Sequence, residues 1–380
     1  MSAQRAGNAP ARGGTRGWVI GHVAGAPVIV TPTWLLAAVL LTAAFAPSVR
    51  DATGLGSGAY LVALVFVVLL FVSVFAHEVA HGLVGRARGQ HPSEFVLTVW
   101  GGHTAFRGAA GGPGTAALVA VAGPVTNLVL GGVFLGLSRV APDHSLAQWL
   151  LWSGAFSNGF VAVFNLLPGL PLDGGQLLES AVWAGTRDRT RGTVVAAWTG
   201  RVVAVVVVLW ALVPDLAAGR SPSTFTVIWA LLIGSFLWSG ATAALRAARR
   251  QRLVRVLSVR SVGRPAVAVG HEESVAVAGA RAAAAGASEV VVLSPDGRPA
   301  AYVDTAAAAS VPAERAGLTS VASVSVPLPV GAVVDGRLEG EPLLRALSDA
   351  SRLSPVLVAL VDGRVVAVVR TADVVAAIRP

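Results

Sequence analysis

Long runs of uncharged, apolar residues constrain this chain more than any other feature of its sequence. The run from Val28 to Pro47 carries no charge over 20 residues, which is enough for a helix to cross the hydrocarbon core of a bilayer. Runs of this kind give six candidate spans: 28–47, 59–84, 115–138, 146–167, 194–217 and 224–245. The sequence therefore predicts an α-helical polytopic membrane protein with about six transmembrane helices.

The overall composition supports this interpretation and excludes several kinds of site. Hydrophobic residues make up 54% of the chain and charged residues only 13%, which is too apolar for an ordinary soluble domain. The net charge is +9, but no basic run with interleaved aromatic residues is present, so we expect no nucleic-acid partner. The chain has no cysteine, which rules out disulfides and thiolate chemistry. Any metal must be bound by His, Asp or Glu.

The arginines that flank the candidate spans predict how the chain crosses the membrane. With six spans, both termini lie on one side. One side collects fourteen arginines: 5, 12, 16, 86, 88, 107, 187, 189, 191, 246, 249, 250, 252 and 255. The other side has only Arg50, Arg139 and Arg220. Because cytoplasmic loops are enriched in basic residues, we expect both termini in the cytoplasm. All basic residues are arginine, which is typical of a high-G+C bacterium, so the expected location is the bacterial cytoplasmic membrane.

Two segments of the first unit have alternative interpretations. Residues 1–17 predict a disordered basic arm, and 18–250 the six-span domain. The arm and the first apolar run resemble a secretory signal, but Pro47 would follow the cleavage point, which favours an uncleaved first span. Arg201 lies inside the fifth span, where it either snorkels to the cytoplasmic interface or pairs with a buried carboxylate.

Outside the spans the sequence predicts β-structure. Glu94–Trp100 and His103–Arg107 alternate weakly in polarity, and Gly101–Gly102 between them predicts a tight hairpin turn. After the last span, residues 258–380 predict a soluble α/β domain with an internal repeat. Glu289–Ser310 aligns with Pro355–Ala376 at an offset of 66, each half reading strand, Asp-Gly turn, strand and helix.

The sharpest motif is HEVAH, from His77 to His81, at the end of the second span. Histidines at i and i+4 project from one helical face, so both imidazoles can reach one Zn²⁺. Glu78 lies beside them, where it can take a proton from water. The alternative without a metal, in which two histidines cap a membrane helix at the interface, is disfavoured because ionisable groups inside a span are costly and usually functional.

A catalytic zinc normally has three protein ligands, so a third must come from elsewhere. The best candidate is Asp173 in NLLPGLPLDGG, 165–175, at the cytoplasmic end of the fourth span and at the depth of HEVAH. Prolines and glycines break the helix there, which is tolerated at membrane depth only in packed protein or beside a wet cavity. An ordinary Pro/Gly-rich loop is the alternative for this segment taken alone.

HEVAH followed by NLLPGLPLDGG resembles the site-2 protease family of intramembrane zinc metalloproteases, over all six spans. This resemblance implies one Zn²⁺ per chain bound by His77, His81 and Asp173, with Glu78 as the general base and Asn165 near the scissile peptide. AGPVTN, 122–127, matches a further family segment, in which Asn127 braces the site or contacts substrate. The Gly-rich loop of the family matches 96–106, so Gly101, Gly102 and His103 are candidate substrate-binding residues.

The C-terminal repeat resembles a pair of CBS domains, which implies a regulatory module. The nucleotide motif of that family places a Thr or Ser three positions before an Asp. The second repeat offers Arg370 and Asp373, and the first offers Asp304 and Ala307. We therefore expect at most one weak adenine-nucleotide site, at Asp373, and a mainly structural or dimerising role, with the chain a candidate homodimer.

These observations lead to one expected function and two alternatives. The expected function is an intramembrane zinc metalloprotease acting in regulated proteolysis. Its expected substrates are single-span membrane proteins, such as anti-sigma factors or signal-peptide remnants. A transporter would also use broken helices and polar residues in the membrane, but it needs no general base beside a metal. A catalytically inactive homologue serving as a scaffold is disfavoured, because every expected catalytic residue is present.

Overall fold

The computed structural model describes residues 16–99, 101–108 and 111–379, and the chain divides into two compact units, 1–245 and 246–380. The boundary falls inside one long helix, α7, which runs from Thr224 to Arg255. The predicted basic arm lies almost wholly in residues 1–15, outside the described residues.

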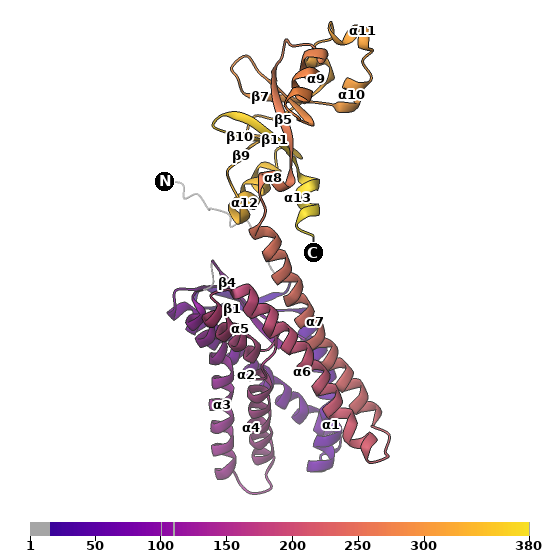
Figure 1. Ribbon diagram of the computed structural model, residues 1–380. Coiled ribbons are helices and arrows are strands. Elements are labelled where there is room, and N and C mark those ends of the chain that lie inside the picture. The colour runs from indigo at the N-terminus through magenta and orange to yellow at the C-terminus, as the bar shows by residue number, and fades with distance from the viewer. Residues whose placement is uncertain (1–15, 100, 109–110, 380) are drawn as a thin grey trace, which may run out of the picture. The chain divides into compact units, whose positions relative to one another are not determined.

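Helices make up most of the first unit (Figure 1). Their bounds are α1 Pro32–Thr53, α2 Ala59–Ala87 after the short 3₁₀ turn η1 Gly56–Gly58, α3 Pro113–Val140, α4 Leu146–Asn165, α5 Asp173–Thr186, α6 Arg189–Ala217 and α7. In the described residues, five of these helices are long and apolar enough to cross a membrane: α1, α2, α3, α6 and α7. The predicted fold class, a polytopic helical membrane protein, is confirmed. The sixth predicted span is α4, which is 20 residues long but carries Gln148 and Asn158.

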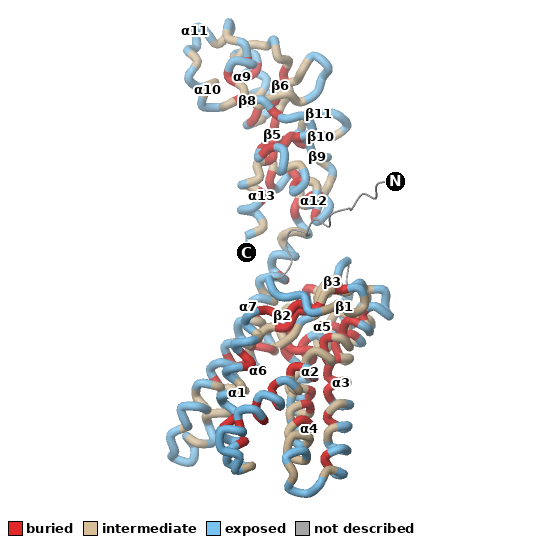
Figure 2. The backbone as a smooth tube through the Cα atoms, turned by 180° about the vertical axis from the view of Figure 1, so that it is seen from behind, coloured by how far each residue is buried: buried red, intermediate tan, exposed pale blue. Residues whose placement is uncertain are grey.

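Large apolar side chains lie on the outer faces of these helices. The exposed fraction reaches 60% for Val129, 64% for Phe156 and 79% for Trp210. Figure 2 shows the same pattern, with exposed segments along most of the helix lengths and buried ones concentrated near the sheet. Such a surface would be unstable in water and is suited to lipid.

A four-stranded sheet lies at one end of the α2–α4 bundle, close to α5 (Figures 1 and 2). Its strands are β1 Trp18–Val23, β2 Ala26–Val30, β3 His91–Thr98 and β4 Gly101–Arg107, in the order β1-β2-β3-β4. The β2–β3 pair is parallel and the other two pairs are antiparallel. In the described part of the sheet, β4 is therefore an edge strand that lies beside α2.

The first predicted span is wrong in its N-terminal part. Residues 28–30 belong to β2, and α1 begins only at Pro32 and continues to Thr53. The turn Ala24–Gly25, with both φ angles positive, folds β2 back on β1, and Thr31 with Pro32 starts the helix. A short uncharged apolar run is equally compatible with a buried strand and with a helix. The composition of residues 28–47 therefore did not show where β2 ends and α1 begins.

The predicted position of the β3–β4 turn is also wrong. Thr98 pairs with Gly101 and Leu97 pairs with Gly102, so both glycines lie inside β4 rather than in the turn. β3 ends at Thr98 and β4 begins at Gly101, and residue 100 lies outside the described residues. Gly102 allows a close approach of backbone to side chain, because a Cβ there would lie 2.3 Å from Cγ of Glu78, whereas Gly101 adopts a positive φ angle of 107°.

Among the described residues, Arg201 does not have the buried carboxylate partner that one of its two predicted environments requires. Its guanidinium lies between the rings of Trp198 and Trp238, 4.7 and 4.9 Å from their centroids. It also donates a 3.1 Å hydrogen bond to Oγ1 of Thr242. In the described structure its partners are thus aromatic rings and a hydroxyl, not a carboxylate. The arrangement joins α6 to α7 by cation–π contacts.

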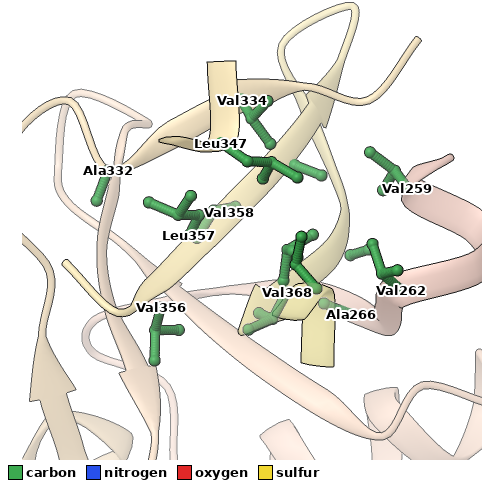
Figure 3. Packing of buried hydrophobic residues seen from close by; sticks show 14 of the residues in the cluster. Val259, Val262, Ala266, Ala332, Val334, Leu347, Val356, Leu357, Val358 and Val368 are labelled. Carbon is green, nitrogen blue, oxygen red and sulfur yellow. The ribbon is translucent and has the colours of Figure 1, made fainter. Parts of the chain in front are cut away.

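The second unit is built on a seven-stranded sheet, in the order β8-β7-β6-β5-β11-β10-β9. The strands are β5 Gly263–Gly270, β6 Glu289–Leu293, β7 Pro299–Val303, β8 Ser325–Pro327, β9 Val333–Asp335, β10 Val356–Val361 and β11 Arg364–Arg370. The helices are α8 Val259–Val262, α9 Val275–Ala284, α10 Thr305–Ala309, α11 Ala313–Ala316, η2 Val321–Val324, α12 Gly340–Ala350 and α13 Thr371–Ala377. Val356, Leu357 and Val358 of β10 lie at the centre of its main core (Figure 3).

The predicted internal repeat is visible in this unit. The hairpin β6–β7 followed by α10 corresponds to the hairpin β10–β11 followed by α13. The turn glycines Gly297 and Gly363 both have positive φ angles, as an Asp-Gly turn requires. The α/β class predicted for this part of the chain is therefore confirmed.

Candidate metal centre

The HEVAH motif lies on α2 near the end of the helix that reaches the sheet. His77, Glu78 and His81 are exposed by only 5%, 6% and 7%. One turn of helix separates the two histidines, and their ring centroids are 4.7 Å apart. One ligand atom from each of the three residues lies within 4.8 Å of the other two. The helix thus brings the motif together as its spacing predicts.

Asp173, the first residue of α5, completes the cluster from a segment almost a hundred residues away. Its Oδ2 lies 3.0 Å from Nε2 of His77 and 3.5 Å from Nε2 of His81. Two ligand atoms of a tetrahedral zinc, at bond lengths of about 2.0–2.1 Å, lie about 3.3–3.4 Å apart. Oδ2 of Asp173 is therefore spaced from each histidine Nε2 as two protein ligands of one zinc ion would be.

The hydrogen bonds on the far side of each imidazole fix which nitrogen faces the centre. Nδ1 of His77 lies 2.5 Å from Oδ1 of Asn127, and Nδ1 of His81 lies 2.7 Å from the carbonyl oxygen of Val119. Both partners accept, so each histidine carries its proton on Nδ1 and turns a lone pair on Nε2 inward. Oδ2 of Asp173 is buried without a hydrogen-bond donor. Three inward-facing acceptors require a cation, and two imidazoles with one carboxylate fit Zn²⁺.

Gly123 on α3 keeps the space between the ligands open. A Cβ at this position would lie 2.4 Å from Nε2 of His77 and 2.5 Å from Nε2 of His81. Any larger residue would thus fill the place where the ligand atoms converge. Pro124 follows within the same helix, in the AGPVTN segment.

Glu78 is held in place by β4. Oγ1 of Thr104 donates to Oε2 of Glu78 at 2.9 Å and also lies 3.0 Å from its backbone oxygen. Alternate residues of a strand face one side, so Gly102, Thr104 and Phe106 of β4 all face α2. Gly102 lets the strand pass directly over the Glu78 side chain. The Glu78 carboxylate is thereby fixed beside His77 and His81. The hydrogen-bond partners of the two histidines are Asn127 and Val119, not Glu78.

These residues line a cavity of about 380 Å³. The two histidines, Glu78 and Asp173 border it, and so do the predicted substrate-binding residues Gly101, Gly102 and His103 and the predicted catalytic residue Asn165. Asn165 is the last residue of α4, and its Nδ2 donates to the carbonyl oxygen of Val161 at 3.1 Å. The geometry therefore joins a metal centre, a carboxylate base and an edge strand in one pocket.

Comparisons with known proteins agree with this arrangement. Residues 139–209, which contain Asn165 and Asp173, match peptidase family M50. A Synechocystis protein that is provisionally named a zinc metalloprotease is 33% identical over 237 residues, covering 60% of each chain. The Mycobacterium tuberculosis protein provisionally named zinc metalloprotease Rip3 is 37% identical over 181 residues, covering 46% of this chain and 44% of its own length.

Solved structures give weaker similarities. The site-2 protease from Methanocaldococcus jannaschii has a TM-score of 0.44 and 23% identity, covering 60% of this chain and 95% of its own. The CBS domain of a bacterial CNNM/CorC family Mg²⁺ transporter has a TM-score of 0.26 and 18% identity, covering 36% and 87%. The chain spans at most about 60% of the length of the curated relatives described above.

The position of Asn127 corrects one prediction about this site. Its side chain is fully buried, accepts from His77 and donates to Asn158, and it does not border the cavity. It is therefore placed to brace a ligand and not to contact substrate.

The sequence also missed three residues. Thr104 holds Glu78, Gln176 donates to Oδ1 of Asp173 at 3.3 Å, and Asn158 holds Asn127. Two of them had a signal in the sequence. Gln176 lies at i+3 from Asp173 on the same helix, and Asn158 is a polar residue within an apolar span.

The predicted nucleotide residue, Asp373, lies in the second unit and contacts other protein groups. Its Oδ2 lies 3.3 Å from Nε of Arg264. Arg370 contacts the buried carboxylate of Glu289 at 2.9 Å, and Arg264 lies 3.5 Å from the same oxygen. In the first repeat, Asp304 caps α10 by accepting from Ala306 N. A nucleotide at Asp373 would have to replace an existing network of ion pairs.

Proposed function

We propose that this chain hydrolyses peptide bonds in transmembrane segments of other membrane proteins as a zinc metalloprotease. The observation that carries the proposal is the convergence of His77, His81 and Asp173 on one point, with Glu78 beside it in a cavity between membrane helices. The match of residues 139–209 to peptidase family M50 supports the same activity.

When bound, zinc polarises a water and the substrate carbonyl and lowers the pKa of that water. Glu78 then takes the proton of the attacking water and passes it to the leaving nitrogen. Thr104 keeps the carboxylate turned toward the reacting atoms by donating to Oε2. Asn165, at the cavity wall, is placed to orient the peptide or to stabilise the developing oxyanion.

The substrate must be extended in the site, because a helix hides its carbonyl groups in internal hydrogen bonds. β4 offers a way to hold it, since this edge strand passes over Glu78 and borders the cavity. A substrate segment added as a fifth strand would receive backbone hydrogen bonds along Gly101–Arg107. Single-span proteins such as anti-sigma factors and signal-peptide remnants are the substrates that we propose.

We place the site near the cytoplasmic face of the bacterial inner membrane, with both termini in the cytoplasm. The support is the distribution of arginines together with the position of the histidines. His77 is the nineteenth residue of α2, about 27 Å along the helix from its other end. The transporter and scaffold alternatives gain no support from a carboxylate held beside three convergent ligands.

Replacing Glu78 tests the proposal. Glu78→Gln keeps the shape of the side chain but removes the base, so zinc content and thermal stability should stay at the wild-type level while cleavage falls by about 10²–10⁴-fold. Asp215→Asn, which changes a half-buried carboxylate of the same unit that pairs with Arg220, is the matched control and should cleave normally. Cleavage by Glu78→Gln within a few-fold of wild type would contradict the mechanism.

A further inference from the structure

A chain of buried polar side chains runs through the membrane helices behind the metal centre. Ser73 on α2, Asn127 on α3 and Asn158 on α4 are exposed by only 3%, 0% and 1%. Polar groups at such positions are costly unless they are fully hydrogen-bonded, and they are usually retained for a function. This series of hydrogen-bonded side chains ends at His77, one of the proposed zinc ligands.

The direction of every hydrogen bond in this chain is set by two backbone carbonyls. Oγ of Ser73 donates to Leu69 O at 3.1 Å, and Nδ2 of Asn158 donates to Gly154 O at 2.9 Å. Carbonyl oxygens only accept, so the amide of Asn158 must turn its nitrogen toward Gly154 O. The hydroxyl proton of Ser73 is used on Leu69 O, so Oγ of Ser73 accepts from Nδ2 of Asn158 at 3.1 Å. Its Oδ1 is left to accept from Nδ2 of Asn127 at 2.8 Å.

The orientation of Asn158 therefore decides the orientation of Asn127. With its nitrogen engaged by Asn158, Asn127 turns Oδ1 toward Nδ1 of His77. This contact holds the histidine proton on Nδ1 and leaves Nε2 free to bind metal. If the Asn127 amide were reversed, its N–H group would face Nδ1, the proton would move to Nε2, and that proton would compete with the metal.

We propose that Asn158 and Ser73 are positioning residues for the metal centre, which fix the tautomer and ring orientation of His77 through Asn127. The proposal rests on the zinc site proposed above. Outer-shell partners of metal-binding histidines typically contribute about 10–100-fold to metal affinity, and Asn158 acts one bond further out. Asn158→Leu should therefore weaken zinc binding about 10-fold, toward the lower end of that range.

Zinc affinity of the full chain in detergent, measured by competition with a chromogenic chelator, gives a readout that is independent of proteolysis. Ser157→Ala is the matched control on α4, because its hydroxyl only bonds the local Ser153 carbonyl. Thr126→Val is the matched control on α3, where the hydroxyl bonds Ala122 O. Both controls should bind zinc as wild type does. Ser73→Ala should weaken binding roughly 3-fold, since Asn158 keeps its bond to Gly154 O.

Asn127→Asp separates positioning from helix packing. A carboxylate accepts from His77 in either orientation, so it no longer needs Asn158 to orient it. In the Asn127→Asp background, Asn158→Leu and Ser73→Ala should each change zinc affinity by less than about 2-fold. If Asn158 and Ser73 only supported helix packing, each substitution would lower zinc affinity by the same factor with Asn127 and with Asn127→Asp.

Two results would overturn the proposal. One is wild-type zinc affinity in Asn158→Leu and Ser73→Ala, and the other is an equal loss in the presence and absence of Asn127→Asp. If Asn158→Leu does not fold, Ser73→Ala, which places alanine in a helix, tests the same coupling. Failure of the proposed function is distinguishable, because a chain that binds zinc through this relay but cleaves nothing would contradict only the protease assignment.

Discussion

Gly123→Ala is the sharpest test of where the metal binds. The added Cβ would lie 2.4 Å from Nε2 of His77 and 2.5 Å from Nε2 of His81. An ordinary van der Waals contact begins at 3.4 Å, so each ligand atom would have to move by about 1 Å. Metal sites tolerate about 0.2 Å in their bond lengths. The methyl group must therefore displace at least one ligand, and zinc affinity should fall by more than the roughly 100-fold upper limit of outer-shell changes.

The assay for Gly123→Ala is chelator competition on purified protein, with metal analysis after dialysis and a thermal melt to show that the chain is folded. Gly136→Ala is the matched control, because it lies on the same helix α3 with no atom within 4 Å of the new Cβ. We expect the control to bind one zinc normally. If Gly123→Ala kept zinc affinity within about 3-fold of wild type, the convergence of the two Nε2 atoms on this space would be wrong.

Three further predictions concern the ligands, the topology and the second unit. His81→Ala and Asp173→Ala should each lose zinc and cleavage together, as metal analysis and a proteolysis assay would show; full zinc in either variant would refute the ligand assignment. The chain has no native cysteine, so a cysteine placed at Arg249 should react with a membrane-impermeant reagent only from the cytoplasmic side, and labelling only from outside would overturn the topology. Calorimetric titration of the full chain with ATP, ADP and AMP should show at most one weak site, abolished by Asp373→Ala, because Arg264 already engages Asp373; two tight sites would contradict this expectation.

The local parts of the site could be predicted from the sequence. HEVAH places two histidines and a glutamate on one helix, and helical periodicity alone brings them together. Asp173 is distant in sequence, yet the arrangement of the spans put it at the same depth as the motif. The Asp-Gly turns of the second unit were also readable, because their φ angles restrict the residue type.

The parts that sequence reasoning missed depend on contacts between distant segments. Asn158 bonds Ser73 across 85 positions of sequence, and Thr104 bonds Glu78 across 26. Neither pair has a periodic signature. Gly101 and Gly102 were predicted to form a turn because a turn is the commonest local reason for a Gly-Gly pair. In the structure both lie in β4, where Gly102 lets the strand pass over Glu78 and Gly101 adopts a positive φ angle. The strand β2 was hidden because a short apolar run carries no sign of where a sheet ends and a helix begins.

Cleavage by the reconstituted protein tests the central claim most directly. The metal-free chain and a single-span substrate would be placed in liposomes, zinc added stepwise, and the products identified by mass spectrometry. We predict that cleavage appears with one equivalent of zinc, that the cut lies within the substrate span near its cytoplasmic end, and that Glu78→Gln binds the same zinc without cutting. Cleavage that proceeds without metal, or that is unchanged in Glu78→Gln, would contradict the account.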